Sequence, residues 1–371
     1  MYRYITYIIV VLCMISCIDP FEVDIDDEKA GGQLVVEGII THELKPQQIR
    51  LTRSSTVDDF SGYKAEIGAS VTIKDDLDNC YQLFEFQPGV YLTDSSGFKP
   101  TVGRSYKLQI TLRDETEYSS DFQLLKPIDD IDRLWARGEK ETYLTGSVIS
   151  ESEKLNIYTN IDLNKKEFLR FDYSGVYQLK SAYQGSGVCW TPDEVIPPEI
   201  LPLNDTITCF KNQNVLLPLN VFSFSNLKSN ENFNQKILSI TPNRLFYYGY
   251  SMLVRKYALT EGFYNYLADI KEQNNFGGDL FAPPPTAIEG NISEVGNNGN
   301  RALGFFSTSN MTSKRIFIDN EVLKDPIRDP FNTDDCYMDL DPAVNVRPQP
   351  FCCDCRLLEG TTVEKPDVWP L

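Results

Sequence analysis

The stretch QLVVEGIIT (residues 33–41) decides the fold, because apolar and β-branched residues fill most of its positions. The next segments repeat this pattern: QQIRLTRSS, GASVTIKDD, CYQLFEFQ, GVYLTD and SYKLQITLRD. Turn-forming pairs such as Pro88-Gly89 and Val102-Gly103 separate them. Short strands at this spacing predict a mainly β protein that begins with an antiparallel β-sandwich of immunoglobulin or transthyretin type over residues 33–126.

The β pattern continues beyond that sandwich. RLWARGEKETYL, LNIYTNID, EFLRFDYSGVYQLK and YGYSMLVRKYAL predict further strands, so residues 127–325 are expected to form a second β-rich domain. Near its end, ALGFFSTSN and SKRIFID predict a final pair of strands. Residues 326–371, rich in Pro, Asp and Cys, are expected to form an irregular tail packed on the second domain.

One amphipathic helix is predicted near residues 260–275. Thr260 is a fair N-cap, Glu261 places an acid in the first turn, and two glycines follow the segment. Apolar side chains fall on one face of this helix: Phe263, Tyr266, Leu267 and Ile270. Such an aromatic stripe usually packs on a core, so we interpret it as structural and not as a ligand site.

The N-terminus resembles a lipoprotein signal. Residues 1–16 combine a basic start with an apolar run that is too short to span a bilayer, which is typical of a signal peptide. Met14-Ile15-Ser16-Cys17 resembles a bacterial lipobox, in which cleavage precedes a lipid-modified cysteine. Cys17 is therefore the predicted lipidation site, and its acyl chains would hold the protein on outer-membrane lipid.

An acidic segment follows the cysteine. Residues 17–32 are expected to form a solvated tether, because a segment so rich in charge cannot bury enough apolar surface to fold. It also resembles the acidic signals of surface-exposed lipoproteins of Bacteroidota. The expected location is the outer membrane, lipid-anchored and facing the cell exterior.

No catalytic or metal-binding motif stands out. The net charge of −18 argues against nucleic-acid partners. His42, the only histidine, lies in a turn and is expected to be exposed, so two-histidine metal sites are impossible. Asp75, Asp76 and Asp78 lack the register of a calcium loop and predict a hairpin turn. We therefore expect no catalytic residue, no metal and no cofactor.

The cysteines beyond Cys17 predict disulfides, because an exported chain folds in an oxidising compartment. Cys189 and Cys209 bracket a Pro-rich loop, and a bond between them would remove about 3 kcal/mol of loop entropy. A second set is formed by Cys336, Cys352, Cys353 and Cys355. Zinc is the alternative there, but the spacing is not that of a zinc ribbon, so we favour disulfides with Cys336 bonded into the CCDC cluster. Cys80 is expected to stay a free thiol.

Several segments together resemble the DUF4249 lipoproteins of Bacteroidota. They are CIDPF, LVVEGIIT, the block from YSMLVRKYAL through GGDLFAPPPTAIEGNIS to SKRIFI, and the closing CCDCR and KPDVWP. The resemblance covers nearly the whole chain. It implies no catalytic residues, since that family has no established enzymatic activity. It further implies an outer-membrane lipoprotein that accompanies a TonB-dependent transporter.

Three functions compete. The leading hypothesis is a non-catalytic accessory or ligand-capturing partner of a TonB-dependent β-barrel transporter. The second is an exported glycan-acting hydrolase, because carboxylate pairs hydrolyse glycosides without histidine and Trp135, Trp190 and Trp369 could stack on sugars. The third is a structural or adhesion module of the cell surface, which the predicted sandwich supports equally well.

Overall fold

The computed structural model describes residues 32–55, 63–94, 98–145, 148–165, 167–182, 207–213, 219–227, 232–276, 288–325, 327–330, 336, 349–367 and 369. The predicted signal peptide, Cys17 and almost all of the acidic tether lie outside these residues. Strands dominate the described part, which confirms the prediction of a mainly β fold. Within that part, no helix combines the length and the apolar character needed to cross a membrane.

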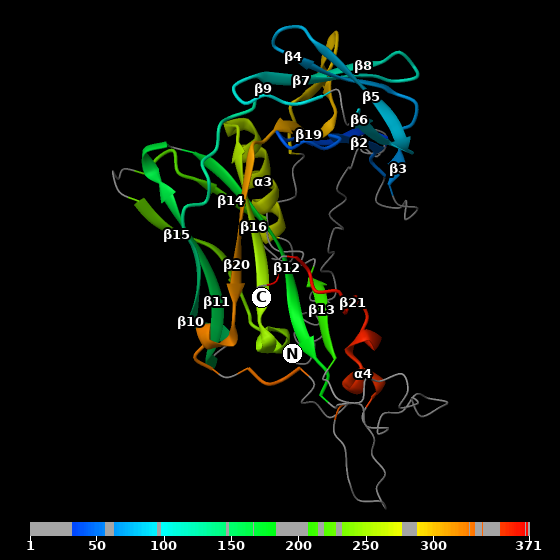
Figure 1. Cartoon of the computed structure of the whole chain (residues 1–371). Helices are drawn as coiled ribbons and strands as arrows, with labels where there is room; N and C mark the ends of the chain where they lie inside the picture. Colours follow the sequence, from blue (N-terminus) through cyan, green and yellow to red (C-terminus); the bar gives the residue numbers. More distant parts are fainter. Residues whose placement is uncertain are drawn as a thin grey trace, which may run out of the picture.

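Sheet A forms the first module, at the top of Figure 1. Its twelve strands are β1 (Leu34–Ile40), β2 (Gln48–Arg53), β3 (Lys64–Ala65), β4 (Ser70–Asp75), β5 (Cys80–Gln87), β6 (Val90–Thr93), β7 (Ser105–Thr111), β8 (Glu117–Ser120), β9 (Gln123–Leu124), β17 (Ile292–Glu294), β18 (Asn297–Arg301) and β19 (Leu303–Thr308). Their order is β18-β17-β8-β7-β4-β5-β6-β2-β1-β19, with β3 beside β2 and β9 beside β7.

The alternation of side chains builds the core of sheet A. In β1, Leu34, Val36 and Ile40 face inward and are fully buried, and β7 buries Tyr106 and Leu108 in the same way. Residues of β17 and β19 belong to the same apolar cluster as those of β1 and β7. The sheet therefore curls around one shared core, and its other face points outward.

The second module, below it in Figure 1, consists of two sheets. Sheet B holds β10 (Leu134–Thr145), β11 (Val148–Asp162) and β15 (Asn232–Ile240). Sheet C holds β12 (Phe168–Lys180), β13 (Thr208–Gln213), β14 (Asn220–Ser223), β16 (Tyr250–Leu259), β20 (Met311–Ile318) and β21 (Thr361–Thr362). One apolar cluster joins them, and the Tyr173 hydroxyl of sheet C donates to the Ile237 carbonyl of sheet B at 2.6 Å.

The two modules share a stretch of chain. β16 and β20 are antiparallel neighbours in sheet C, yet the chain between them leaves the second module and adds β17, β18 and β19 to sheet A. The predicted pairing of ALGFFSTSN with SKRIFID is therefore wrong, because β19 instead runs parallel to β1. Residues 292–308, expected within the second domain, instead join the sheet of the first, through the pairing of β17 with β8 and of β19 with β1.

In the described residues, α3 (Glu261–Phe276) is the long helix. The others are α4 (Pro350–Cys353) and the 3-10 turns η1 (Leu163–Lys165), η2 (Arg244–Tyr248), η3 (Asn320–Val322) and η5 (Cys355–Leu357). The helix predicted near residues 260–275 is confirmed, and the Thr260 hydroxyl accepts from the Phe263 amide at 3.3 Å.

Helix α3 lies where the two modules meet, just below β19 in Figure 1. Its Phe263 ring packs on Phe305 of β19 with centroids 5.2 Å apart, and Tyr264 packs on Phe168 of β12 at 4.9 Å. The helix therefore contacts both modules, and Phe263 and Leu267 of the stripe belong to the apolar cluster that joins them. This agrees with the structural interpretation of the stripe.

Candidate functional site

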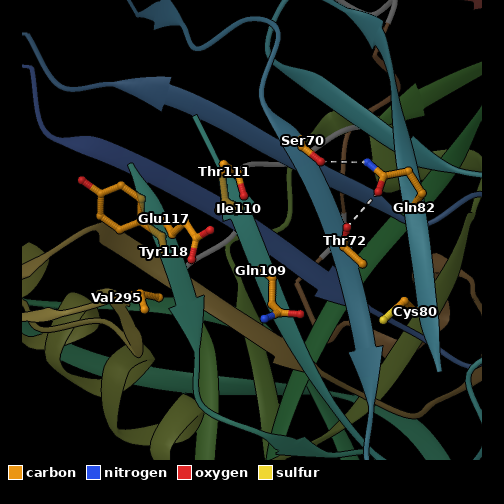
Figure 2. Close-up of a pocket in the computed structure, with 10 residues that line it drawn as sticks. All are labelled: Ser70, Thr72, Cys80, Gln82, Gln109, Ile110, Thr111, Glu117, Tyr118 and Val295. Atoms are coloured by element: carbon orange, nitrogen blue, oxygen red, sulfur yellow. Dashed lines mark hydrogen bonds between the residues drawn. The ribbon is translucent and has the colours of Figure 1, made fainter. Parts of the chain in front are cut away.

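A hollow of about 340 Å³ lies on the outer face of sheet A, over strands β4, β5, β7 and β8 (Figure 2). Because Val71 and Ile73 of β4 point into the core, Ser70 and Thr72, which alternate with them, point outward. The same alternation turns neighbouring strands' polar residues to this face. The lining residues are Ser70, Thr72, Cys80, Gln82, Gln109, Ile110, Thr111, Glu117, Tyr118 and Val295.

Hydroxyl and amide groups dominate the lining. The Thr72 hydroxyl donates to Gln82 Oε1 at 2.9 Å, and Gln82 Nε2 donates to the Ser70 hydroxyl at 3.3 Å, as Figure 2 shows. Gln109 pairs directly with Thr72 across β4 and β7. These groups offer both donors and acceptors to a neutral polar ligand. Glu117 is the one carboxylate among them, so the hollow lacks the paired acids that glycoside hydrolysis uses.

An aromatic side chain borders this polar surface. Phe84 lies on the outward-facing side of β5, two residues beyond Gln82, and is 64% exposed. Its cross-strand partner Leu92 of β6 is half-buried. An exposed ring beside amide and hydroxyl groups is suited to binding a ligand with both apolar and polar parts.

The acidic residues at the end of β4 and just after it form a hairpin turn, as predicted. Asp75 Oδ1 accepts from the backbone amides of Leu77 and Asn79, both at 2.9 Å. Burial raises the pKa of Asp75, but these bonds, a bond from the Asn79 side chain and the nearby Arg104 outweigh it, so the pKa lies below its usual value. Among the residues the structure describes, no group of three or more His, Cys, Asp or Glu is arranged to hold a metal.

His42 lies between β1 and β2, in the turn where it was predicted, but it is half-buried and not exposed. Its Nδ1 accepts from the Met311 amide at 3.4 Å, at the junction of the two modules. No carboxylate or hydroxyl bonds to it in the described part of the chain, so the ring has no triad partner there.

Two of the three tryptophans lie among the described residues, and both pack against other rings. Trp135 stacks on Tyr158 with centroids 5.6 Å apart, and the Arg133 guanidinium lies 4.8 Å from its ring. Trp369 is only 8% exposed, between Phe210 and Phe317. Trp369 is thus enclosed in the second module, whereas Trp135 is half-buried between Tyr158 and Arg133. Trp190 lies outside the described residues.

Among the residues that the structure describes, two disulfides hold the C-terminal tail. Cys209 of β13 is bonded to Cys355, with Cα atoms 6.0 Å apart, and Cys336 is bonded to Cys352. The prediction of a Cys189–Cys209 bond is therefore wrong, because Cys209 has another partner. The prediction that Cys336 joins the CCDC cluster is confirmed, and Cys80 is free and exposed, as expected. Cys189 lies outside the described residues, as does the side chain of Cys353.

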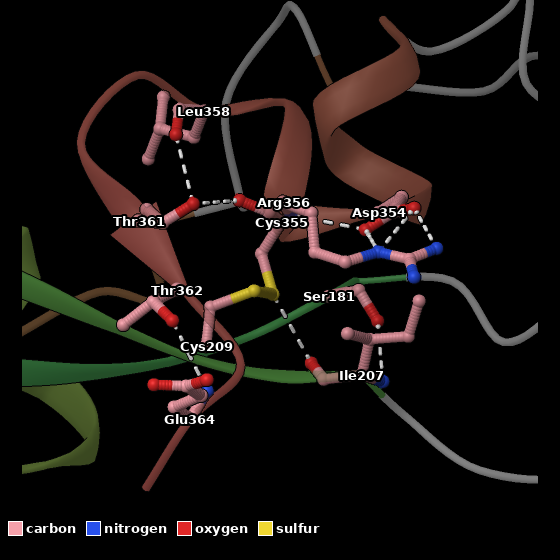
Figure 3. Close-up of a disulfide and its surroundings, with 10 residues drawn as sticks. All are labelled: Ser181, Ile207, Cys209, Asp354, Cys355, Arg356, Leu358, Thr361, Thr362 and Glu364. Atoms are coloured by element: carbon pink, nitrogen blue, oxygen red, sulfur yellow. Dashed lines mark hydrogen bonds and ion pairs between the residues drawn. A yellow bond between two sulfur atoms is a disulfide. The ribbon is translucent and has the colours of Figure 1, made fainter. Parts of the chain in front are cut away.

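Figure 3 shows the Cys209–Cys355 disulfide and the hydrogen bonds around it. The Thr361 hydroxyl donates to the Cys355 carbonyl at 2.7 Å, and Arg356 Nε donates to Asp354 Oδ1 at 2.8 Å. Strand β21 continues from this turn and pairs with β13. The tail is thereby fixed to the edge of sheet C.

Sequence reasoning did not identify the hollow. In the sequence, the hollow corresponds to the polar positions that alternate with apolar ones: Ser70 and Thr72 in GASVTIKDD, and Cys80 and Gln82 in CYQLFEFQ. Polar outer positions are expected on any half-exposed sheet, so the pattern alone does not distinguish a binding face. The neighbouring strands β7 and β8 supply the rest of the lining, and their order in the sheet follows only from the fold.

The described residues form two β modules, with a polar hollow on the first and a disulfide-bonded tail on the second, and they define a mainly β protein. The chain belongs to the family described as "Domain of unknown function (DUF4249)", whose model matches residues 18–315. The resemblance to this family is thus confirmed. No curated protein and no solved structure matches the chain.

Proposed function

We propose that the chain is a non-catalytic lipoprotein of the outer membrane, anchored through acylated Cys17 and facing the cell exterior. In this proposal it is an accessory, ligand-capturing partner of a TonB-dependent β-barrel transporter. The lipobox-like residues before Cys17 and the acidic segment after it support the location. The resemblance to outer-membrane lipoproteins supports the partner.

The observation that supports ligand capture is the hollow on sheet A. Its hydroxyl and amide groups are suited to holding a polar ligand, and Phe84 beside it adds apolar surface. Glu117 alone supplies a carboxylate there, which favours binding over bond cleavage.

The position of the anchor is compatible with docking on a membrane barrel. Fourteen residues lie between Cys17 and Gly32, where the described structure begins. Fully extended, such a segment spans at most about 50 Å. The folded body can therefore stand clear of the lipid headgroups while it stays tied to the membrane.

Co-purification tests the partner. A tagged chain is cross-linked in intact cells and purified from detergent-solubilised membranes, and mass spectrometry identifies the bound proteins. We expect a TonB-dependent transporter as the main partner, and its loss with the unanchored Cys17→Ser variant. Recovery of only unrelated proteins with the anchored chain would contradict the proposal.

The acidic segment tests the surface location separately. Asp24, Asp26, Asp27 and Glu28 are replaced by their amides, which leaves the lipobox-like residues unchanged. If the acids act as an export signal, protease added to intact cells digests the wild-type protein and spares the variant. Equal digestion of both would show that the segment is only a solvated spacer.

A further inference from the structure

Two arginines lie side by side on the outer face of sheet C. Arg255 of β16 and Arg315 of β20 have the same orientation in the sheet, because Arg315 pairs with Leu253, two residues before Arg255. The opposite face of β16 carries the buried Met252 and Val254, which belong to the core between sheets B and C. The two guanidinium groups therefore point away from that core.

Serine hydroxyls orient both guanidinium groups. Arg255 Nη1 donates to the Ser174 hydroxyl of β12 at 3.1 Å, and Arg315 Nη1 donates to the Ser251 hydroxyl of β16 at 3.0 Å. A weaker contact of 3.4 Å joins the same Arg315 nitrogen to the Ser251 carbonyl. Each arginine thus donates through Nη1 to the described residues around it. The edge formed by Nε and Nη2 is the one that can bind a carboxylate or phosphate through two parallel hydrogen bonds.

Neither arginine forms an ion pair with a carboxylate in the part of the chain that the structure describes. The carboxylate opposite Arg255 in the register is Asp172. Both of its oxygens already accept from Arg170, at 2.9 and 2.7 Å. By contrast with Arg255 and Arg315, three other arginines each form an ion pair with a carboxylate: Arg53, Arg104 and Arg356.

Two positive charges at this distance disfavour each other. Burial lowers the pKa of Arg315, and the neighbouring charge of Arg255 lowers it further. The chain carries 53 acidic residues against 35 basic ones, so carboxylates were available to neutralise this pair. Like charges held together at a cost in stability are typical of sites that bind a ligand of opposite charge.

Aromatic side chains flank the two arginines on both sides along the strands. Tyr257, two residues beyond Arg255, packs with helix α3, and the Arg170 guanidinium lies 5.5 Å from its ring. At the other end, Trp369 packs on Phe317 of β20 and Phe210 of β13. The pair thus lies between the helix and the stapled tail, on strands whose order Figure 1 shows.

We propose that Arg255 and Arg315, positioned by Ser174 and Ser251, form a binding site for an oxyanion group, the carboxylate or phosphate of a ligand. The site lies on the second module and is distinct from the hollow on sheet A. It requires no transporter, so its test is independent of the proposed function.

The experiment uses the mature chain purified in detergent, with inorganic phosphate and malonate as separate probes. Calorimetry at low ionic strength is expected to give saturable binding of at least one probe to the wild-type protein, and thermal unfolding is expected to shift upward with that probe. Arg255→Gln and Arg315→Gln each remove a charged fork, which weakens binding about tenfold or more. The double variant is expected to lose the thermal shift.

Arg137→Gln is the matched control, because Arg137 is a highly exposed arginine on sheet B. It removes the same charge and should leave the affinity unchanged. Binding of phosphate alone would identify a phosphoryl ligand, and binding of malonate a carboxylate ligand. The proposal is overturned if the wild-type protein binds neither probe, or if the double variant binds as the wild type does while circular dichroism shows both to be folded.

Discussion

Gly304 of β19 lies so close to β1 that a Cβ atom on residue 304 would stand 2.0 Å from the Val36 carbonyl oxygen. The two residues are register partners in the parallel pair that joins the start of the described chain to a segment far along it. Gly304 also has φ +93°, a conformation that side chains rarely adopt. This contact holds the edge of sheet A together.

Gly304→Ala should therefore destabilise the protein strongly. We expect a loss of about 2–5 kcal/mol in the free energy of unfolding, from backbone strain and from the displaced strand. Urea denaturation followed by tryptophan fluorescence measures it. Gly296→Ala is the matched control, because Gly296 has φ +85° and open space around it. Equal losses for both variants would show that the contact with Val36 is unimportant.

The Cys209–Cys355 bond closes a loop of 146 residues. Replacing both cysteines by serine should lower the free energy of unfolding by about 2–5 kcal/mol, since the unfolded chain gains entropy. The Cys336–Cys352 pair, which closes 16 residues, gives the comparison and should cost less. Peptide mapping under non-reducing conditions checks the linkage itself. A cross-linked peptide containing Cys189 and Cys209 would contradict it.

The lowered pKa of Asp75 predicts that the folded protein loses stability in acid. Its pKa lies below the usual 3.8 in the folded protein, so the ionised form stabilises the fold above that pH. The stabilisation is lost as the pH falls through the lowered pKa. Asp75→Asn should therefore be less stable than wild type at pH 7, and the difference should shrink below pH 3.8. Urea denaturation at several pH values tests this.

Asp78→Asn is the control for that measurement, because the Asp78 side chain is 86% exposed and belongs to the same turn. It should change stability little at any pH. A difference between Asp75→Asn and wild type that stays constant into the acid range would show that the charge of Asp75 is irrelevant.

Cys17→Ser should abolish lipidation, because serine lacks the sulfur that forms the thioether. Labelled fatty acid is expected to enter the wild-type protein and not the variant, and the unprocessed precursor should accumulate. Cys80→Ser removes an exposed free thiol elsewhere and should keep the label. Label in the Cys17→Ser protein would refute the assignment.

Local features of the sequence determined the elements. The apolar alternation of QLVVEGIIT predicted β1, Thr260 with its aromatic stripe predicted α3, and the acids after β4 predicted a turn. Each depends on residues within a few positions of one another, because strand alternation, helix periodicity and turn bonds are short-range effects.

Only the tertiary structure decided which distant segments meet. β19 pairs with β1 and not with β20, and Cys209 bonds Cys355, because sheet edges and packed side chains bring them together across the whole chain. The hollow around Thr72 and Gln82 and the pair Arg255 and Arg315 arise in the same way. Strand order sets which outward-facing side chains become neighbours, and alternation within a single strand does not contain that order.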